Sequence, residues 1–333
     1  MYRSGNRKVL TVSLKALVSL LLLSWMFSHI EWTELSDTLK NAQLSWMFAT
    51  LGWVILSVGV SVVKWGYIFK ASKLDLPYRV LWKSYWAGLF FNNFLPSSIG
   101  GDGIRIYWTG KYSGDLPGAT TSVVVERVLA TMGLCLTALL AVPFSRTGVP
   151  ELIGLFFVIL SLSIFVLFLI LFPKLTDFLQ HRLAAWPKAQ TFLEGLSLHG
   201  VRLRNHPGCL VRALGWSVIF QLCVVMVNWS IFRGLSVQEL GFFEAAYLIP
   251  ATSVAAMLPV GVNGYGLREG AYITLFATLD IPSSVAMTAS ILFALIVSLA
   301  SLWGGWIWIR EGRELNGKDR IEVSHREAGS QLF

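Results

Sequence analysis

Charged residues are scarce in this sequence, and their scarcity excludes an ordinary soluble domain. Asp, Glu, Lys and Arg make up 14% of the 333 residues, whereas soluble domains carry about a quarter. Hydrophobic residues make up 55%, and several apolar runs reach about twenty residues, which is enough to cross the hydrocarbon core of a bilayer. The composition therefore predicts a polytopic, helical membrane protein.

Cysteine is also scarce, with three residues in the chain. No two of them form a C-x-x-C pair, and none has the spacing to histidine of a zinc site. The sequence contains no H-E-x-x-H, no G-x-S-x-G and no complete phosphate-binding loop. We therefore expect no metal, no cofactor and no enzyme activity. The net charge of +8 is interpreted as a signal of membrane topology, not of nucleic-acid binding.

One motif occurs twice, at Leu95–Arg105 and at Leu258–Arg268. Both copies read L-P-x-x-[I/V]-x-G-x-G-[I/L]-R without a gap, and such self-similarity indicates that the chain has two related halves. A helix cannot run smoothly through a proline followed closely by glycines. Hydrophobic elements that are broken at matching places in two halves point to the binding site of a transporter.

Six apolar segments are expected to cross the membrane, at roughly 10–28, 44–69, 119–142, 151–172, 209–231 and 284–309. Broken elements cover roughly 80–112 and 242–280. If each broken element enters and leaves on the same side, the halves are inverted copies. We therefore predict an all-α polytopic membrane protein of two inverted repeats, 1–148 and 149–310, each with three transmembrane helices and one re-entrant element. A polar cytoplasmic tail follows at 311–333.

The distribution of Lys and Arg supports this topology. The connection after the first helix is acidic, and the connection after the second is basic. The long connection 173–208 and the tail are also basic, as cytoplasmic loops are. We therefore expect both termini in the cytoplasm and the protein in the cell inner membrane; if the broken elements crossed fully, connection 173–208 would lie outside. Lys64 is expected to extend its amine to the inner interface.

The arginine that ends each motif is the main candidate for substrate binding. A re-entrant element places the N-terminus of its second arm inside the membrane, where free amides and the helix dipole favour an anion such as a phosphate. Arg105 and Arg268 lie in the first turn of these arms, and an intramembrane arginine needs an anionic partner. We expect both to face a shared central cavity and to hold a phospholipid headgroup. Alternatively, they pair with Asp102, Glu126 or Glu269, or extend to an interface.

Polar and glycine residues near the motifs complete the predicted site. Asp102 and Asn263 precede the second arms and are candidate N-caps. Asn92 and Asn93 either line a polar cavity or bond the broken backbone. Glu126 and Arg127 either pair with each other as structural charges or are partners of the first motif. The site also includes four glycines, which could instead serve only close helix packing: Gly101, Gly103, Gly264 and Gly266.

Three stretches, Phe91–Arg105, Val125–Arg127 and Leu258–Glu269, resemble the lysylphosphatidylglycerol synthase transmembrane region, a family also described as flippase-like. The resemblance covers roughly 10–310. In the two-part synthase, the membrane region is thought to flip an aminoacylated lipid that a separate soluble domain makes. Because 23 residues follow Arg310, we expect that domain to be missing. The resemblance therefore implies lipid translocation and argues against aminoacyl transfer.

These observations predict a lipid translocase that moves an anionic or polyprenyl-linked lipid across the cytoplasmic membrane. The expected site lies between the two re-entrant elements, and the expected partner is the membrane lipid itself. Two alternatives stay open. One is an accessory membrane subunit of a cell-envelope glycosyltransferase or lipid-synthesis complex, with a lipid-modifying enzyme as its partner. The other is an intramembrane transferase.

Overall fold

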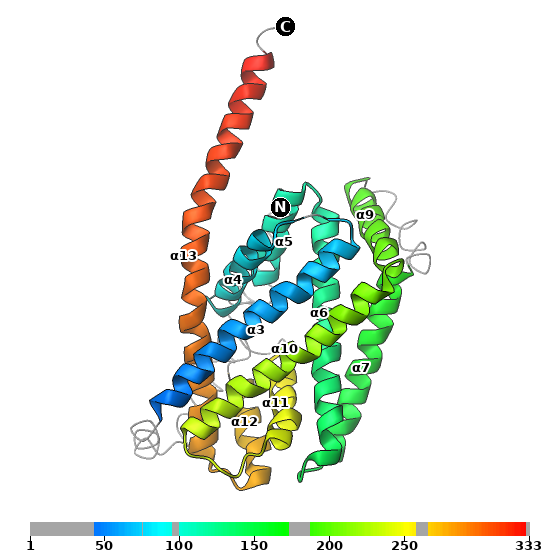
Figure 1. The fold of residues 1–333 in the computed structure, drawn as a ribbon. Coiled ribbons are helices and arrows are strands. Elements are labelled where there is room, and N and C mark those ends of the chain that lie inside the picture. Colours follow the sequence, from blue (N-terminus) through cyan, green and yellow to red (C-terminus); the bar gives the residue numbers. More distant parts are fainter. Residues whose placement is uncertain (1–42, 75, 95–99, 173–186, 258–265, 331–333) are drawn as a thin grey trace, which may run out of the picture.

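The computed structural model describes residues 43–74, 76–94, 100–172, 187–257 and 266–330, and helices account for nearly all of them. No strand occurs in these ranges. The helices form one elongated bundle, from which the C-terminal helix projects (Figure 1). The all-helical class predicted from composition is thereby confirmed.

Five helices in the described ranges are long and apolar enough to cross a membrane. They are α3 (Leu44–Ala71), α6 (Leu116–Ala141), α7 (Pro150–Leu171), α10 (Pro207–Gly234) and α13 (Ser283–Ser330). Each coincides with a predicted crossing, while the helix predicted at 10–28 lies outside the described residues. α13 runs beyond its predicted end near 309, so the polar tail continues the helix as far as Ser330.

Each motif begins between two described helices, and the interruption predicted from its proline and glycines falls on residues outside the described ranges. α4 (Tyr78–Phe94) and α5 (Gly100–Ser113) flank the first break, and α11 (Phe242–Met257) and α12 (Leu267–Phe276) flank the second. The breaks themselves, 95–99 and 258–265, lie outside the described residues. Short 3-10 turns follow α6 and α12, at Val142–Phe144 and Ala277–Leu279.

One further helix, α9 (Pro187–Arg204), lies in the long connection 173–208, for which no helix was predicted. Its C-terminal turns bury His199 and Leu203 against α6 and α7. A Cβ added to Gly200 would lie 2.0 Å from the carbonyl oxygen of Ile170, so α9 and α7 approach closely at this glycine. Tertiary packing stabilises this helix, although its polar composition gave no apolar segment long enough to span a membrane.

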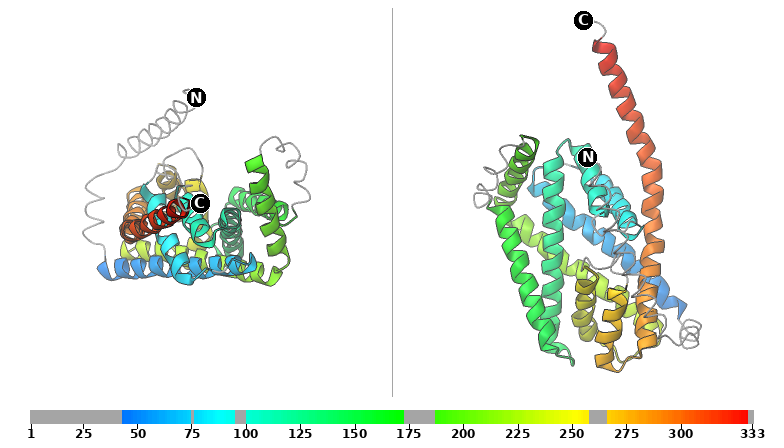
Figure 2. Two further views of the ribbon diagram at one scale, coloured as in Figure 1. Left: turned by 90° about the horizontal axis from the view of Figure 1, so that it is seen from above. Right: turned by 180° about the vertical axis from the view of Figure 1, so that it is seen from behind.

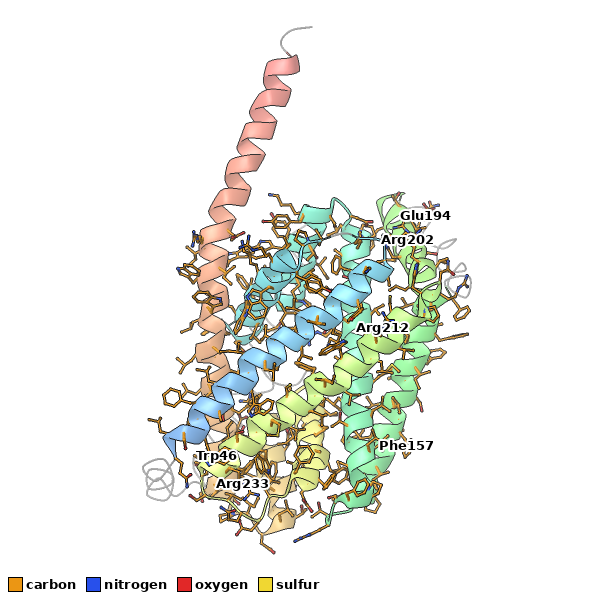
Figure 3. All side chains as sticks on the ribbon, viewed as in Figure 1. Trp46, Phe157, Glu194, Arg202, Arg212 and Arg233 are labelled. Atoms are coloured by element: carbon orange, nitrogen blue, oxygen red, sulfur yellow. The ribbon has the colours of Figure 1, made fainter. Side chains whose placement is uncertain are left out.

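α3 and α10 pack side by side and run in opposite directions (Figure 1). At one end of the pair, the amide of Gln43 donates to the carbonyl of Gly234 at 2.8 Å. At the other end, Nη1 of Arg202 donates to the carbonyl of Ser72 at 3.3 Å. Figure 3 shows Arg202 at the end of the bundle opposite to Trp46. We call the end that contains Arg202 the α9 end, and the end that contains Trp46 the far end.

The two broken elements occupy opposite halves of the bundle. α4 and α5 lie toward the α9 end, whereas α11 and α12 lie toward the far end (Figures 1 and 2). α4 packs on α5 and α13, and α11 packs on α12 and α6. α13 leaves the bundle at the α9 end (Figure 2). The first arm of each broken element therefore packs on the second arm of that element and on one spanning helix, which is α13 for α4 and α6 for α11.

Candidate functional site

Five charged side chains lie where the first motif meets α3 and α6, and we call them the charge cluster. Its members are Lys64 on α3, Asp102 and Arg105 on α5, and Glu126 and Arg127 on α6. Lys64 Nζ lies 2.5 Å from Oε1 of Glu126, and Nη1 of Arg105 donates to Oε2 at 3.1 Å. Nε and Nη2 of Arg127 donate to the two oxygens of Asp102, each at 2.8 Å. Because Arg105 also reaches Asp102 at 3.3 Å, all five groups are linked.

Arg105 points into packed protein, away from lipid. It follows Asp102 by three residues, so both side chains share one face of α5. Its guanidinium carbon lies 4.2 Å from the ring centroid of Trp65 and 4.5 Å from that of Tyr85, and both contacts are favourable cation–π geometries. The side chains of Arg105 and Glu126 are 3% and 2% exposed. The guanidinium is therefore fixed both by aromatic rings and by carboxylates.

Arg127 differs from the other two cations because it lies at the surface of the bundle. Its side chain is 45% exposed, whereas that of Lys64 is 0% exposed. Arg127 follows Leu116, the first residue of α6, by eleven positions, which corresponds to about 16 Å at about 1.5 Å per residue. That distance is about half of a hydrocarbon core about 30 Å thick. A half-exposed charge at this depth requires water or an anionic partner, and in this structure Asp102 is that partner.

The cations of the charge cluster outnumber its carboxylates. Lys64, Arg105 and Arg127 face Asp102 and Glu126, which leaves one positive charge without a counter-charge within the cluster. Among the described residues, Nε and Nη2 of Arg105 are buried and have no hydrogen-bond partner. Buried donors without partners lose free energy relative to water. The cluster is therefore suited to accept a further anionic group.

The second motif leads into a smaller group that is balanced in charge. Nη2 of Arg268 donates to Oε1 of Glu269 at 2.7 Å, and its Nε donates to Ser290 on α13 at 3.1 Å. Oε2 of Glu269 accepts the amide of Gly266 at 2.6 Å, which caps α12. Gly266 has a φ of 88°, a conformation that favours glycine. These bonds fasten α12 to α13.

The two arginines of the motifs thus belong to different groups. Arg105 contacts residues of α3, α4, α5 and α6, whereas Arg268 contacts residues of α12 and α13. Each arginine pairs with a carboxylate, which was one of the two predicted alternatives. Their common role toward a ligand in a shared central cavity stays a prediction.

Three sequence interpretations near the first motif are decided by these contacts. Glu126 and Arg127 are partners of the motif, since they bind Arg105 and Asp102. The assignment of Asp102 as an N-cap is wrong, because α5 begins at Gly100 and Asp102 already lies in its first turn, where its carboxylate binds arginines. The expectation for Lys64 is also wrong. Its amine pairs with Glu126 inside the bundle, and the sequence analysis therefore missed it as a member of the site.

The remaining candidates lie beside the break. Oδ1 of Asn92 accepts the amide of Gly101 at 3.0 Å, so this asparagine bonds the broken backbone. Asn93 is partly buried on α4. Gly103 is exposed on α5, and in the described part of the chain no heavy atom lies within 4 Å of a Cβ added there. Asn263 and Gly264 lie outside the described residues.

Gly101→Ala is expected to destabilise the protein, whereas Gly103→Ala is not. A Cβ at Gly101 would lie 2.0 Å from the carbonyl oxygen of Gly88, so α4 and α5 would have to separate at a cost of about 1–3 kcal/mol. At Gly103 the added methyl meets nothing, and alanine favours the helix by about 0.5–1 kcal/mol. Thermal unfolding in detergent measures both. Equal transition temperatures for the two variants would contradict the close helix crossing.

The chain is similar to a known family of membrane proteins and to two UPF0104 membrane proteins. A family model, described as the lysylphosphatidylglycerol synthase TM region, matches residues 12–304. A UPF0104 membrane protein of Methanocaldococcus jannaschii is 26% identical over 268 residues, which cover 73% of this chain and 78% of that protein. A UPF0104 membrane protein of Methanothermobacter thermautotrophicus is 21% identical over 289 residues, covering 79% of this chain and 84% of that protein. The range matched by the family model includes both motifs and the whole charge cluster.

Proposed function

We propose that this chain, which belongs to the lysylphosphatidylglycerol synthase transmembrane family, moves an anionic or polyprenyl-linked lipid between the two leaflets of the membrane. The family match confirms the resemblance carried by the paired motifs, and it supports a multi-pass membrane protein. The observation that carries the proposal is the charge cluster, in which a half-exposed Arg127 lies about midway along a spanning helix. A lipid headgroup that passes between leaflets must be stabilised at that depth.

An internal repeat is supported by the helix boundaries. α10 begins and ends 163 residues after α3 (207 less 44, and 234 less 71). Met257 and Phe276, which end α11 and α12, follow Phe94 and Ser113, which end α4 and α5, by the same interval. α3 and α10 run in opposite directions, and the contacts of α4 with α13 correspond to those of α11 with α6. This pairing is expected of inverted copies.

The re-entrant course of α4 and α5 is supported by the contacts of α9. Arg202 binds the carbonyl of Ser72, just before α4, and Nε2 of His199 lies 2.8 Å from Oδ2 of Asp115, just after α5. Both ends of the first broken element therefore lie at the α9 end. The second broken element starts at the far end, where the hydroxyl of Tyr247 donates to the carbonyl of Val149 at 2.8 Å. Two half-depth elements that start from opposite ends suit alternating access to one central site.

The orientation follows from the charge of the two ends. Basic residues at or just after the C-terminal ends of α3 and α9 lie at the α9 end, namely Lys70, Lys73, Arg202 and Arg204, and we assign this end to the cytoplasm by the positive-inside rule. α13 also leaves the bundle at that end, which supports a cytoplasmic C-terminus (Figure 2). A protein of this orientation fits the cell inner membrane of a bacterial-type cell.

Cysteine labelling in intact cells tests this orientation. Glu194 is exposed on α9, and Gly148 is exposed at the far end, where a Cβ meets no atom within 4 Å. In a background with the partly exposed Cys209 replaced by Ala, Gly148→Cys is expected to react with an impermeant maleimide. Glu194→Cys is expected to react only after permeabilisation. Ready labelling of Glu194→Cys in intact cells would contradict the inverted-repeat topology.

Lipid exchange by the purified protein tests the proposed function. The protein is reconstituted in liposomes that carry a fluorescent anionic phospholipid, and the fraction accessible to an external quencher is followed with time. We expect exchange without ATP, since no nucleotide-binding motif is visible in the sequence. Exchange no faster than in protein-free liposomes would contradict the proposal. Activity that depends on a co-purified lipid-modifying enzyme would instead favour the accessory-subunit alternative.

A further inference from the structure

We propose that Asp102 occupies the place of a substrate phosphate on Arg127, and that a lipid phosphate group displaces it when it binds. The inference rests on the proposed function and names the chemical group that the site takes. It also gives the two halves of the chain different roles. The charge cluster of the first half binds the headgroup, whereas the pair of Arg268 and Glu269 fastens α12 to α13.

The first argument is the geometry of the pair. Nε and Nη2 of Arg127 donate in parallel to the two carboxylate oxygens of Asp102, each at 2.8 Å. A phosphate presents two oxygens to a guanidinium in the same bidentate way. The side chains of Arg127 and Asp102 are 45% and 15% exposed, so an incoming group can reach this pair without opening the buried part of the cluster.

The second argument is that a second cation, Arg105, is in position to bind Asp102 once it leaves Arg127. Oδ1 of Asp102 already lies 3.3 Å from Nη1 of Arg105. In the described structure, Nε and Nη2 of that same arginine are buried and have no hydrogen-bond partner. When Asp102 leaves Arg127, it can complete the bonding of Arg105. After the exchange, Arg127 pairs with the phosphate and Asp102 keeps Arg105 as its partner, so neither carboxylate nor guanidinium is left unpaired in the membrane.

The third argument is the charge balance. The cluster contains three cations and two carboxylates, and an unbalanced charge at this depth is costly. A phosphodiester carries one negative charge and would bring the sum to zero. The pair of Arg268 and Glu269 is neutral by itself, and Glu269 also caps α12, so this pair carries no excess of positive charge.

The space beside Asp102 supports the same direction of approach. Gly103 is exposed on α5, and among the described residues no atom lies within 4 Å of its Cβ position. Tight helix packing therefore does not explain this glycine, in contrast to Gly101, whose Cβ position lies 2.0 Å from a carbonyl oxygen. A glycine next to the exposed pair lets a headgroup approach the backbone of α5 closely.

Binding measurements on Asp102→Asn test the proposal. Titration calorimetry in detergent compares three probes: the monoanionic lipid dihexanoylphosphatidylglycerol, inorganic phosphate and uncharged dihexanoylglycerol. Removing the competing carboxylate is expected to lower the Kd for the anionic lipid about ten-fold or more. Asp280→Asn is the matched control. Asp280 is exposed in a left-handed conformation that Asn also adopts, and its replacement should leave the Kd unchanged.

Each outcome decides a separate point. Tighter binding of the lipid and of inorganic phosphate together identifies the phosphate as the recognised group. Tighter binding of the lipid alone shows that the acyl chains contribute, and still supports displacement of Asp102. An unchanged or raised Kd in a monodisperse Asp102→Asn protein overturns the proposal, even if lipid exchange persists. Tighter binding without any exchange by the parent protein would instead overturn the proposed function.

Discussion

Glu126→Ala is expected to prevent stable folding. The carboxylate of Glu126 pairs with Lys64 and Arg105, whose side chains are 0% and 3% exposed. Removing one partner of a buried ion pair costs about 3–5 kcal/mol, because the other charge stays buried. The total stability of a protein is about 5–15 kcal/mol, so this loss is a large share of it. The yield of monodisperse protein and its thermal transition measure the effect.

A second variant separates the loss of charge pairing from the loss of volume. Adding Lys64→Met to Glu126→Gln removes one buried cation together with the carboxylate, and Arg105 keeps Asp102 as a partner. Replacing a buried pair by groups of similar size is often nearly neutral, so most of the stability should return. Glu151→Ala, at an exposed position in the first turn of α7, should change stability by less than about 1 kcal/mol. Parent-like stability of Glu126→Ala alone would show that the pairs carry little free energy.

The spanning helices could be predicted from sequence because their signal is local. A run of about twenty apolar residues is enough to predict a crossing, and α7 has this property throughout. The breaks were predicted for the same reason, since proline and glycine act on their own backbone, and they fall on residues outside the described ranges. α9 was missed because it is not apolar, and its buried His199 is recognised only from the packing of α6 and α7 around it.

The membership of the charge cluster could be predicted only in part. The motif itself singled out Arg105, and its neighbourhood offered Asp102 and Glu126 as partners. Arg105 binds both, and its contact with Glu126 depends on how α5 packs on α6, which no local pattern specifies. Lys64 was assigned to the interface because a lysine near a helix end commonly extends there. Its true partner, Glu126, is distant in the sequence and comes close only through the packing of α3 on α6.

The two glycines of the first motif show the same limit at a finer scale. Gly101 and Gly103 are two positions apart and look equivalent in the sequence. The Cβ position of Gly101 is blocked by the carbonyl of Gly88, and that of Gly103 is free. Helix packing thus explains the first glycine, while the second is a candidate for contact with the ligand. Only the positions of neighbouring backbone atoms distinguish these roles.

Arg127→Ala is expected to slow lipid exchange about ten- to a hundred-fold while the protein stays folded. A charged hydrogen-bonding group contributes about 1.5–3 kcal/mol, which corresponds to that factor in affinity. Folding should persist because Arg127 is 45% exposed and Asp102 keeps Arg105 as its partner. Arg127→Lys should restore only part of the rate, since lysine lacks the planar fork that binds a phosphate through two bonds. The measurement is the liposome exchange rate at equal protein density.

The control for Arg127→Ala replaces a different exposed arginine by alanine. Arg212 is exposed on α10 (Figure 3) and is not a member of the charge cluster, so Arg212→Ala should exchange lipid at the parent rate. Arg268→Ala tests whether the two halves of the chain have different roles. It breaks the pair with Glu269 and should lower the thermal transition temperature more than Arg127→Ala does. If Arg127→Ala is monodisperse and exchanges lipid as fast as Arg212→Ala, the headgroup passes elsewhere. In that case the bidentate pair with Asp102 only holds α5 against α6.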